Sequence, residues 1–406
     1  MSTSSSRPAS AALILIVTQA VYNGGLAIEV ILLGRWLGEV SLAEYFVAPS
    51  LAALFEVGVH FGSQHLLNRE ASVRYDALRR LLPTLLVAAA TTLLVALGVI
   101  GVLRGWIIAV IAGGTLIRAI AALLGAIFIG RGDIWPPAVA RVLTPIVAII
   151  GLLVFVRPEP TLERVALVIL AASATHLGVP ALARGRIDLP LTATADILRS
   201  GWQRLMQQTL PFVGLFFLGQ LFFRTDAALL SWLSGDVAVA HYMLAFKWVE
   251  GFFFVPHVIA STAIPMLAAT DDAMRQRRVL WRYTLACLLG MLVLSIGLRL
   301  LGEPILLFLL SEKFVPSLPY YHVLVWTLPL HALSVFFAAA LVALDCERWL
   351  LVWTAFIALF AISSRMLGVQ EAELFGFCAA LFSTFGLHAL GCCLRLVVAL
   401  HQPTSD

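Results

Sequence analysis

Residues 210–233 read LPFVGLFFLGQLFFRTDAALLSWL, an apolar run that is long enough to cross a bilayer. Arg224 and Asp226 are its only charged side chains. A charge at the centre of a bilayer costs roughly 2.5–3.5 kcal/mol on insertion scales, so such a residue needs a partner or a function to be retained. The run therefore predicts a transmembrane helix and marks these two residues as candidates for a functional role.

The composition of the whole chain is typical of a protein that crosses the membrane many times. Of the 406 residues, 61% are hydrophobic and 12% are charged, whereas about 25% are charged in an average soluble protein. The net charge of +4 arises from basic clusters between the apolar runs, which indicates membrane topology and not nucleic-acid binding. The five cysteines have neither a disulfide pattern nor metal-ligand spacing, so we expect no metal site and no cofactor.

Twelve apolar runs are each about long enough to span a bilayer, and the distribution of basic residues orients them. With the N-terminus in the cytoplasm, sixteen Arg and Lys residues fall in cytoplasmic segments and six, Arg365 among them, in outside loops. The even number of spans then returns the C-terminus to the cytoplasm. The predicted spans are residues 11–34, 43–66, 79–103, 106–129, 135–156, 162–183, 209–233, 238–266, 281–301, 318–344, 349–367 and 373–397.

The second half of the chain repeats part of the first half at an offset of 197 residues. The segment LLGRWLGEVSLAEYFVA, from Leu32, aligns with LLSWLSGDVAVAHYMLA, from Leu229, and Glu29 aligns with Asp226. Such a duplication predicts an all-α membrane protein of two six-helix halves, related by a pseudo-two-fold axis along the membrane normal. Transporters built in this way bind their substrate near the midplane between the halves, so we expect a central cavity there.

The predicted domain boundaries follow from the repeat. Residues 1–183 form the N-terminal six-helix half and residues 207–406 form the C-terminal six-helix half. Residues 184–206 form a cytoplasmic linker between them. The apolar residues in the second half of this linker are spaced as in an amphipathic helix that lies on the inner membrane surface.

Three segments, residues 29–70, 210–267 and 301–349, resemble the oligosaccharide flippase family of the multidrug/oligosaccharidyl-lipid/polysaccharide exporter superfamily. In residues 210–267 the similar features are an acidic residue within a span, a short Gly turn, a Tyr, a basic residue and a Pro before the next loop. The resemblance implies a transporter, not an enzyme, that flips a lipid-linked oligosaccharide across the bacterial inner membrane for the synthesis of cell-surface polysaccharide. It also implies a polyprenyl-(pyro)phosphate-linked substrate, Na⁺ or H⁺ as coupling ion, and a glycan polymerase as partner.

The charged residues within the spans are the candidate binding residues. Guanidinium groups bind phosphate oxygens in a bidentate manner and stay charged at any pH, which suits the anionic headgroup of such a substrate. Buried carboxylates can bind a coupling ion or neutralise a neighbouring cation. The candidates for substrate binding are Arg224, Arg118, Lys247 and Arg141, and the candidates for ion coupling or charge compensation are Asp226, Glu29, Glu56 and Glu250.

Each candidate also has a purely structural interpretation. Arg224 and Asp226 are two residues apart and so lie about 200° apart on a helix, which means that each needs a partner elsewhere. Glu29 is one candidate partner for Arg224. Lys247 and Glu250 are three residues apart on one helix face, where they can neutralise each other.

Two other functions are alternatives to the flippase. A cation-coupled drug exporter of the same superfamily would bind cations, and an excess of acidic residues in the spans would favour it. The charged residues that we assign to the interior of the spans, apart from those counted with the cytoplasmic and outside segments, are instead five basic and four acidic. A multi-pass polymerase or ligase of lipid-linked glycans is less favoured, because the chain has no long outside loop and no catalytic motif.

Overall fold

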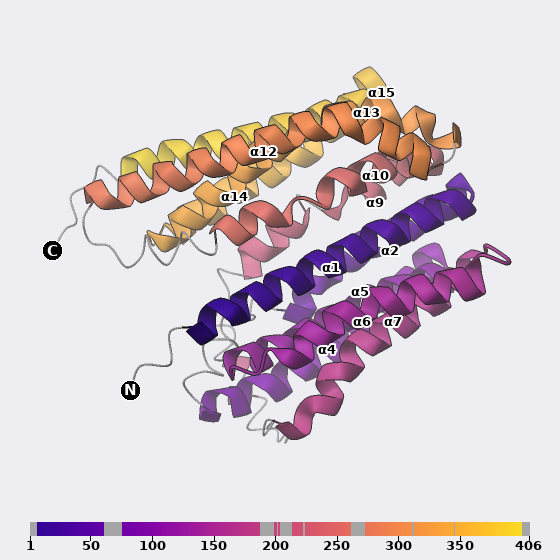
Figure 1. Cartoon of the computed structure of the whole chain (residues 1–406), viewed down its shortest axis with the longest axis horizontal. Coiled ribbons are helices and arrows are strands. Elements are labelled where there is room, and N and C mark those ends of the chain that lie inside the picture. The colour runs from indigo at the N-terminus through magenta and orange to yellow at the C-terminus, as the bar shows by residue number, and fades with distance from the viewer. Residues whose placement is uncertain are drawn as a thin grey trace. The chain divides into compact units, whose positions relative to one another are not determined.

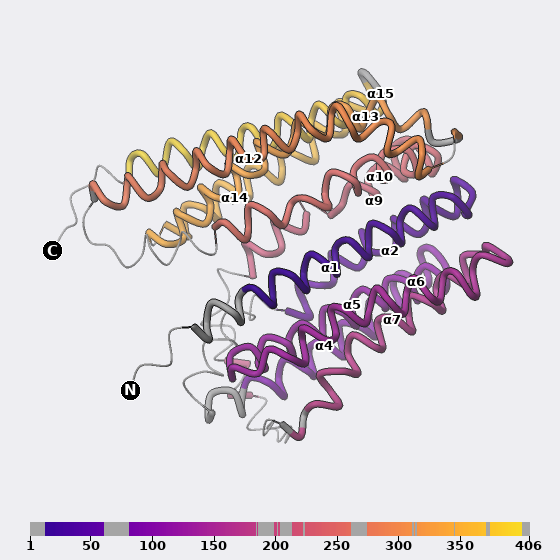
Figure 2. The backbone as a smooth tube through the Cα atoms, viewed as in Figure 1, coloured from indigo at the N-terminus to yellow at the C-terminus, as the bar shows by residue number. Residues whose placement is uncertain are grey.

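The computed structural model describes nine segments of the chain, and all regular elements in these segments are helices (Figures 1 and 2). The chain divides into two compact units, Met1–Leu229 and Leu230–Asp406. Most of the predicted amphipathic helix in the linker lies outside the described residues. The described segments are residues 6–60, 75–186, 199–200, 202–203, 213–221, 224–260, 273–310, 312–344 and 346–399.

The first unit consists mainly of long apolar helices. Residues 213–221 add a further helical segment to it before Thr225, which is not helical. Its labelled elements are α1 (Ser6–Trp36), α2 (Glu39–His60), α4 (Tyr75–Arg104), α5 (Trp106–Gly130), α6 (Trp135–Gly151), the π-helix η1 (Leu152–Val156), α7 (Leu162–Leu182) and the 3-10 helix η2 (Ala183–Arg186).

The second unit has the same character, and its first helix begins just before the division between the units. The elements are α9 (Asp226–Ser234), α10 (Asp236–Glu250), α12 (Ala273–Leu309), the 3-10 helix η3 (Glu312–Ser317), α13 (Leu318–Leu324), α14 (Thr327–Ala343) and α15 (Glu347–Ala399).

The number of helices that can cross a membrane agrees with the prediction of twelve spans. In the described residues, eleven helices are long and apolar enough to span a bilayer. A twelfth span results if the pair Val315–Leu324 and Thr327–Ala343, bent by 42° at a short break, crosses as one. The protein is therefore an all-α, multi-pass membrane protein.

Gly105 separates α4 from α5, where the sequence offers only two residues between two predicted spans. Its φ of +94° lies in the left-handed region, which glycine adopts without the steric penalty that a Cβ atom brings. The backbone can therefore reverse there within a single residue, and α5 runs back along α4.

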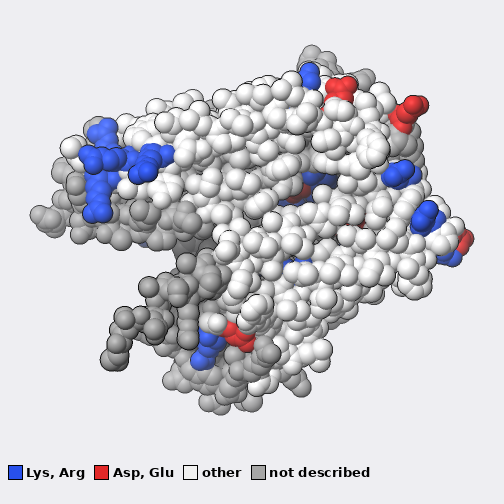
Figure 3. All heavy atoms as spheres, in the orientation of Figure 1, with Lys and Arg blue, Asp and Glu red and all other residues white. Residues whose placement is uncertain are grey.

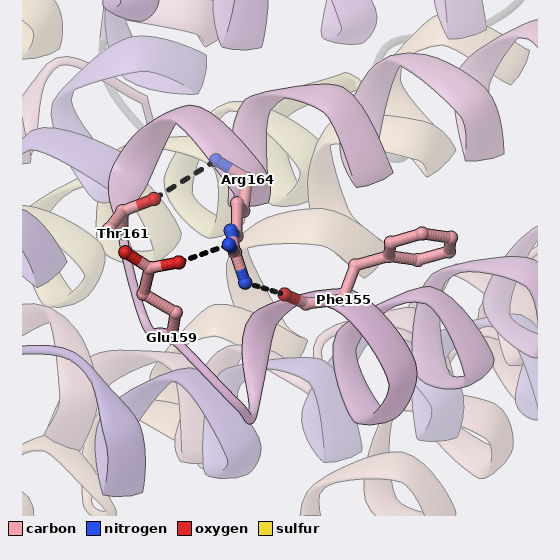
Figure 4. Close-up of polar contacts among 4 residues, drawn as sticks. All are labelled: Phe155, Glu159, Thr161 and Arg164. Carbon is pink, nitrogen blue, oxygen red and sulfur yellow. Dashed lines mark hydrogen bonds and ion pairs between the residues drawn. The ribbon is translucent and has the colours of Figure 1, made fainter.

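The turn between η1 and α7 is held by polar contacts of Arg164 (Figure 4). The Thr161 hydroxyl accepts a hydrogen bond from the backbone N–H of Arg164 at 3.5 Å, as an N-cap residue does. The guanidinium of Arg164 donates to the backbone oxygen of Phe155 at 3.0 Å and forms an ion pair with Glu159. These contacts satisfy backbone groups that the helix ends leave without intrahelical partners.

Helix α5 is the central helix of the first unit, since it contacts α2, α4, α6 and α7. Small residues allow this close packing. A Cβ atom added at Gly114 would lie 3.0 Å from Ile169 and 3.1 Å from the hydroxyl of Ser173, both on α7. Arg118, one turn after Gly114, is thereby placed against the same face of α7.

Helix α15 folds back on itself and so supplies two spans, Glu347–Gln370 and Leu374–Ala399. The two arms approach at Gly368 and Gly376, where an added Cβ atom on either residue would overlap the backbone of the other. Further along the arms, the indole N–H of Trp353 donates to the backbone oxygen of His388 at 3.4 Å. In both pairs the residue on the first arm lies before the turn and its partner lies a similar number of residues after it, so the two arms are antiparallel.

Arg365 is a correction to the predicted topology. The basic-residue count assigned it to an outside loop, but it lies inside the first arm of α15 with 0% of its surface exposed. Its guanidinium carbon lies 5.6 Å from the ring centroid of Phe377 on the second arm. The predicted span 349–367 contained Arg365, so its assignment to a loop in the charge count is the part of the prediction that was wrong.

The close approach in α15 leads to a stability prediction. We expect Gly376→Ala to destabilise the protein by roughly 1–3 kcal/mol, because the new methyl group must displace the backbone of Gly368. Thermal unfolding in detergent, followed by tryptophan fluorescence, measures the shift. Gly290→Ala on α12 is the matched control, since a Cβ atom there has no heavy atom within 4 Å. Equal melting temperatures for the two variants would contradict the prediction.

The repeat in the sequence is visible in the helix boundaries. Helix α2 begins at Glu39 and α10 begins at Asp236, which are 197 residues apart. The aligned acidic residues Glu29 and Asp226 are both buried, with 1% and 2% of their surface exposed. The two repeat segments therefore share this one helix start and the burial of an acidic side chain.

Candidate functional site

Polar side chains from five helices meet inside the first unit, although each comes from an apolar sequence. We call this group the N-terminal polar cluster. Helices α1, α2 and α5 supply one part of it, and α6 and α7 supply the other. Its members are Tyr22, Glu29, Tyr45, Arg118, Arg141, Thr144, Ser173 and His176.

Glu29 and Arg118 lie at the centre of the N-terminal polar cluster. The Tyr45 hydroxyl donates to Oε1 of Glu29 at 2.6 Å, and Nε of Arg118 donates to the Ser173 hydroxyl at 3.0 Å. Glu29, Tyr45 and Tyr22 are the electrostatic neighbours of the Arg118 guanidinium. The two charged residues are therefore neighbours, each hydrogen-bonded to a neutral hydroxyl.

The central pair leaves hydrogen-bonding capacity unused. Oε2 of Glu29 and Nη2 of Arg118 are buried and have no hydrogen-bond partner among the described residues. No ion pair within 4.0 Å joins Glu29 to Arg118 in the described part of the chain. Buried polar atoms without partners are rare in folded proteins, so each such atom calls for a bound water, an ion or a ligand.

Arg141 lies at the edge of the same cluster, towards the start of α1. Its Nη1 donates to the backbone oxygen of Leu15 at 3.5 Å. The ring of His176 lies near both arginines, 5.6 Å from the ring of Tyr22, and its Nδ1 is 2.7 Å from the Thr144 hydroxyl. The structure therefore brings Arg118 and Arg141 into one cluster, around one histidine and one tyrosine.

Arg224 lies elsewhere in the first unit, two residues before the start of α9. Ser50 on α2 holds the backbone there, because its hydroxyl donates to the backbone oxygen of Arg224 and accepts from the backbone N–H of Ala228 at 3.4 Å. The Arg224 side chain is exposed, whereas Asp226, the first residue of α9, is buried. The two charges therefore differ in environment. The predicted separation of about 200° assumed one continuous helix, and it does not apply here because Thr225 between them is not helical.

Glu56 lies further along α2 and contacts the segment before Arg224. Its Oε2 accepts a hydrogen bond from Gln220 at 3.0 Å, and its Oε1 lies 3.6 Å from Nε2 of His60. The ring of His60 in turn contacts Phe216, with 5.6 Å between ring centroids. Helix α2 therefore carries polar contacts to α1 through Tyr45. Its Ser50 and Glu56 make polar contacts to Gln220, Arg224 and Ala228.

Lys247 and Glu250 form an ion pair in the second unit. Nζ of Lys247 lies 2.5 Å from Oε2 of Glu250, as the spacing of three residues predicts. Glu250 is also an electrostatic neighbour of His331, whose ring stacks on Phe253 at 4.0 Å. The structure thus gives Glu250 the charge-compensating contact that the sequence offered as one interpretation.

The sequence did not identify several residues that define these sites. Tyr22, Tyr45 and Ser173 are neutral, so a search for charges in apolar runs does not find them. Arg365 was missed because it was assigned to a loop, although it is fully buried. Among the described residues, no group of three or more His, Cys, Asp or Glu side chains could hold a metal ion.

Comparison with known proteins places the fold. Neither a protein-family model nor a curated protein sequence matches this chain. Solved structures do match over nearly the whole length. An inward-facing multidrug resistance MATE family transporter of the MOP superfamily matches with a TM-score of 0.76 and 16% identity, over 97% of this chain and 100% of that chain.

Two further structures show the range of proteins with this fold. The lipid II flippase MurJ, in an inward closed conformation, matches with a TM-score of 0.74 and 13% identity, over 97% of this chain and 89% of that chain. The Vibrio cholerae MATE transporter VcmN matches with a TM-score of 0.66 and 14% identity, over 98% of this chain and 99% of that chain. This chain therefore has the fold shared by MATE transporters and MurJ, as the sequence resemblance predicted.

Proposed function

We propose that this protein flips a lipid-linked oligosaccharide, carried on a polyprenyl phosphate or pyrophosphate, across the bacterial inner membrane by alternating access. The observation that supports the proposal is the pair Arg118 and Arg141 inside the N-terminal polar cluster. The cluster holds two guanidinium groups and one carboxylate, Glu29. A net positive site inside an apolar protein suits an anionic phosphate group that has to leave water.

The proposal assigns a role to each candidate residue. Arg118, Arg141 and the exposed Arg224 bind the phosphate as it passes, and Lys247 joins them only after its ion pair with Glu250 opens. Because the basic residues outside the spans favour one side, we place both termini in the cytoplasm. The carboxylates compensate these charges or bind a coupling Na⁺ or H⁺, with Asp226, Glu29 and Glu56 as the candidates.

A drug exporter is the second candidate function, and a specific observation favours it. Oε2 of Glu29 is buried and lacks a hydrogen-bond partner among the described residues, so it offers a binding site to an organic cation. One of the solved structures with this fold is a multidrug resistance MATE family transporter, which supports this second candidate. The two candidates differ in the charge of the substrate, which makes them separable by experiment.

Transport by the purified protein in proteoliposomes tests the proposal. One assay follows the flipping of a fluorescent polyprenyl-pyrophosphate-linked oligosaccharide between leaflets, and the other follows the export of a cationic dye. We expect transport of the lipid-linked substrate and none of the dye, with empty liposomes as the control. Dye export without flipping would reject the flippase and support the drug exporter.

A further inference from the structure

A dense group of six arginines, five of them exposed, marks one end of the second unit. Figure 3 shows basic side chains gathered over the beginning of α12, next to a largely uncharged surface. Helix α14 ends at this end of the unit, and both arms of α15 have their outer ends there (Figure 2). We call the group the basic patch, and it consists of Arg275, Arg277, Arg278, Arg282, Arg348 and Arg395.

The members of the basic patch come together from distant parts of the sequence. Four of them lie within the first three turns of α12, and all four are exposed. Arg348 is in the first turn of α15 and is exposed as well. At the other end of α15, Nη2 of Arg395 lies 3.9 Å from Sγ of Cys346, which precedes the helix. The positive charge is therefore concentrated at the end of the unit where α12 begins, α14 ends, and α15 both begins and ends.

A small, mostly apolar pocket lies at the basic patch, between three helices. Its lining comes from α12, α14 and α15, and Arg277 is its charged residue. Trp281 forms one wall and is 50% exposed. Tryptophan at the end of a transmembrane helix is typical of the boundary between lipid headgroups and hydrocarbon. The full lining is Arg277, Leu280, Trp281, Phe337, Cys393, Leu396 and Val397.

We propose that an anionic phospholipid of the surrounding membrane binds at this place, with its phosphate on the basic patch and part of one acyl chain against the small apolar pocket. Arginine binds phosphate oxygens in a bidentate manner. Basic pockets between transmembrane helices are suited to anionic headgroups, and each arginine near the surface strengthens binding about fivefold. A zwitterionic headgroup carries no net charge, so the arginines strengthen its binding much less. The site is independent of the transported substrate.

Quenching of Trp281 fluorescence by brominated lipids tests the proposal on the full-length protein in vesicles. The contribution of Trp281 is obtained by subtracting the signal of Trp281→Phe. We expect brominated phosphatidylglycerol to quench it at lower mole fraction than brominated phosphatidylcholine. The single variant Arg277→Gln should weaken this preference about fivefold, and the triple variant Arg275→Gln, Arg277→Gln and Arg278→Gln should abolish it.

The matched control is Arg299→Gln, which removes an exposed arginine near the opposite end of α12. This variant should keep the full preference for the anionic lipid. Equal quenching by the two lipids in the unmodified protein would overturn the proposal, as would an equal loss in Arg277→Gln and Arg299→Gln. Soluble glycerol phosphate at millimolar concentration should not reduce quenching. If it does, the patch binds free phosphate, and the lipid site is rejected.

Discussion

Replacing Arg118 with alanine should lower the flipping of an anionic lipid-linked substrate by roughly tenfold to a hundredfold. The reason is the loss of a charge-assisted hydrogen bond to phosphate, which contributes about 1.5–3 kcal/mol. Arg118→Lys should restore part of the activity, since lysine keeps the charge but loses the bidentate geometry and the Nε contact to Ser173. Flipping rates in proteoliposomes, normalised to the amount of inserted protein, measure both effects.

Arg104→Ala provides the control for Arg118→Ala. Arg104 is an exposed arginine at the end of α4, in the same unit and outside the N-terminal polar cluster. The variant Arg104→Ala should flip the substrate at the rate of the unmodified protein. Normal flipping by a normally inserted Arg118→Ala would exclude this arginine from phosphate binding. A reduced amount of inserted protein with an unchanged rate per molecule would show that Arg118 serves the fold alone.

Glu29→Gln should separate ion coupling from substrate binding. Glutamine can still accept the hydrogen bond from Tyr45, but it carries no charge, takes up no proton and is a weaker ligand for Na⁺. If Glu29 is the coupling site, the substitution should reduce gradient-driven uphill transport more than tenfold while downhill exchange continues. Transport is measured in proteoliposomes with and without an imposed H⁺ or Na⁺ gradient.

Two companion variants make the result at Glu29 interpretable. Tyr45→Phe removes only the hydrogen bond, which contributes about 1 kcal/mol, so uphill transport should fall by about fivefold. Glu163→Gln removes an exposed carboxylate from the first turn of α7 and should have no effect. Loss of uphill and downhill transport together in Glu29→Gln would instead assign Glu29 to charge compensation of Arg118.

The helices were predictable because the bilayer imposes a simple rule on the sequence. A span has to be apolar over about 20 residues, and the ends of the spans are marked by basic clusters or by glycine, as at Gly105. Arg365 shows where the rule fails. An arginine near the end of an apolar run is compatible with a loop or with a buried position, and only the packing against Phe377 distinguishes them.

The candidate site was predictable in part, for a different reason. A charge in an apolar run is visible without an alignment, so Glu29, Arg118 and Arg141 were found. Their neighbours were not, because the contacts depend on which helices pack together. Glu29 was considered as a partner for Arg224, but the structure places it beside Arg118 through the packing of α5 against its neighbours. Lys247 and Glu250 were the exception, because a pair on one helix needs no tertiary information.

The contact of Ser50 with the start of α9 involves only main-chain atoms of residues 224 and 228. A backbone oxygen is present whatever side chain position 224 carries, so these two hydrogen bonds do not constrain the residue type at position 224. Evolution or a protein engineer could therefore exchange the side chain at position 224 to suit a substrate of different charge while α2 continues to hold the helix in place. The residue type at position 50 is restricted, because both hydrogen bonds are made by the side-chain hydroxyl of Ser50.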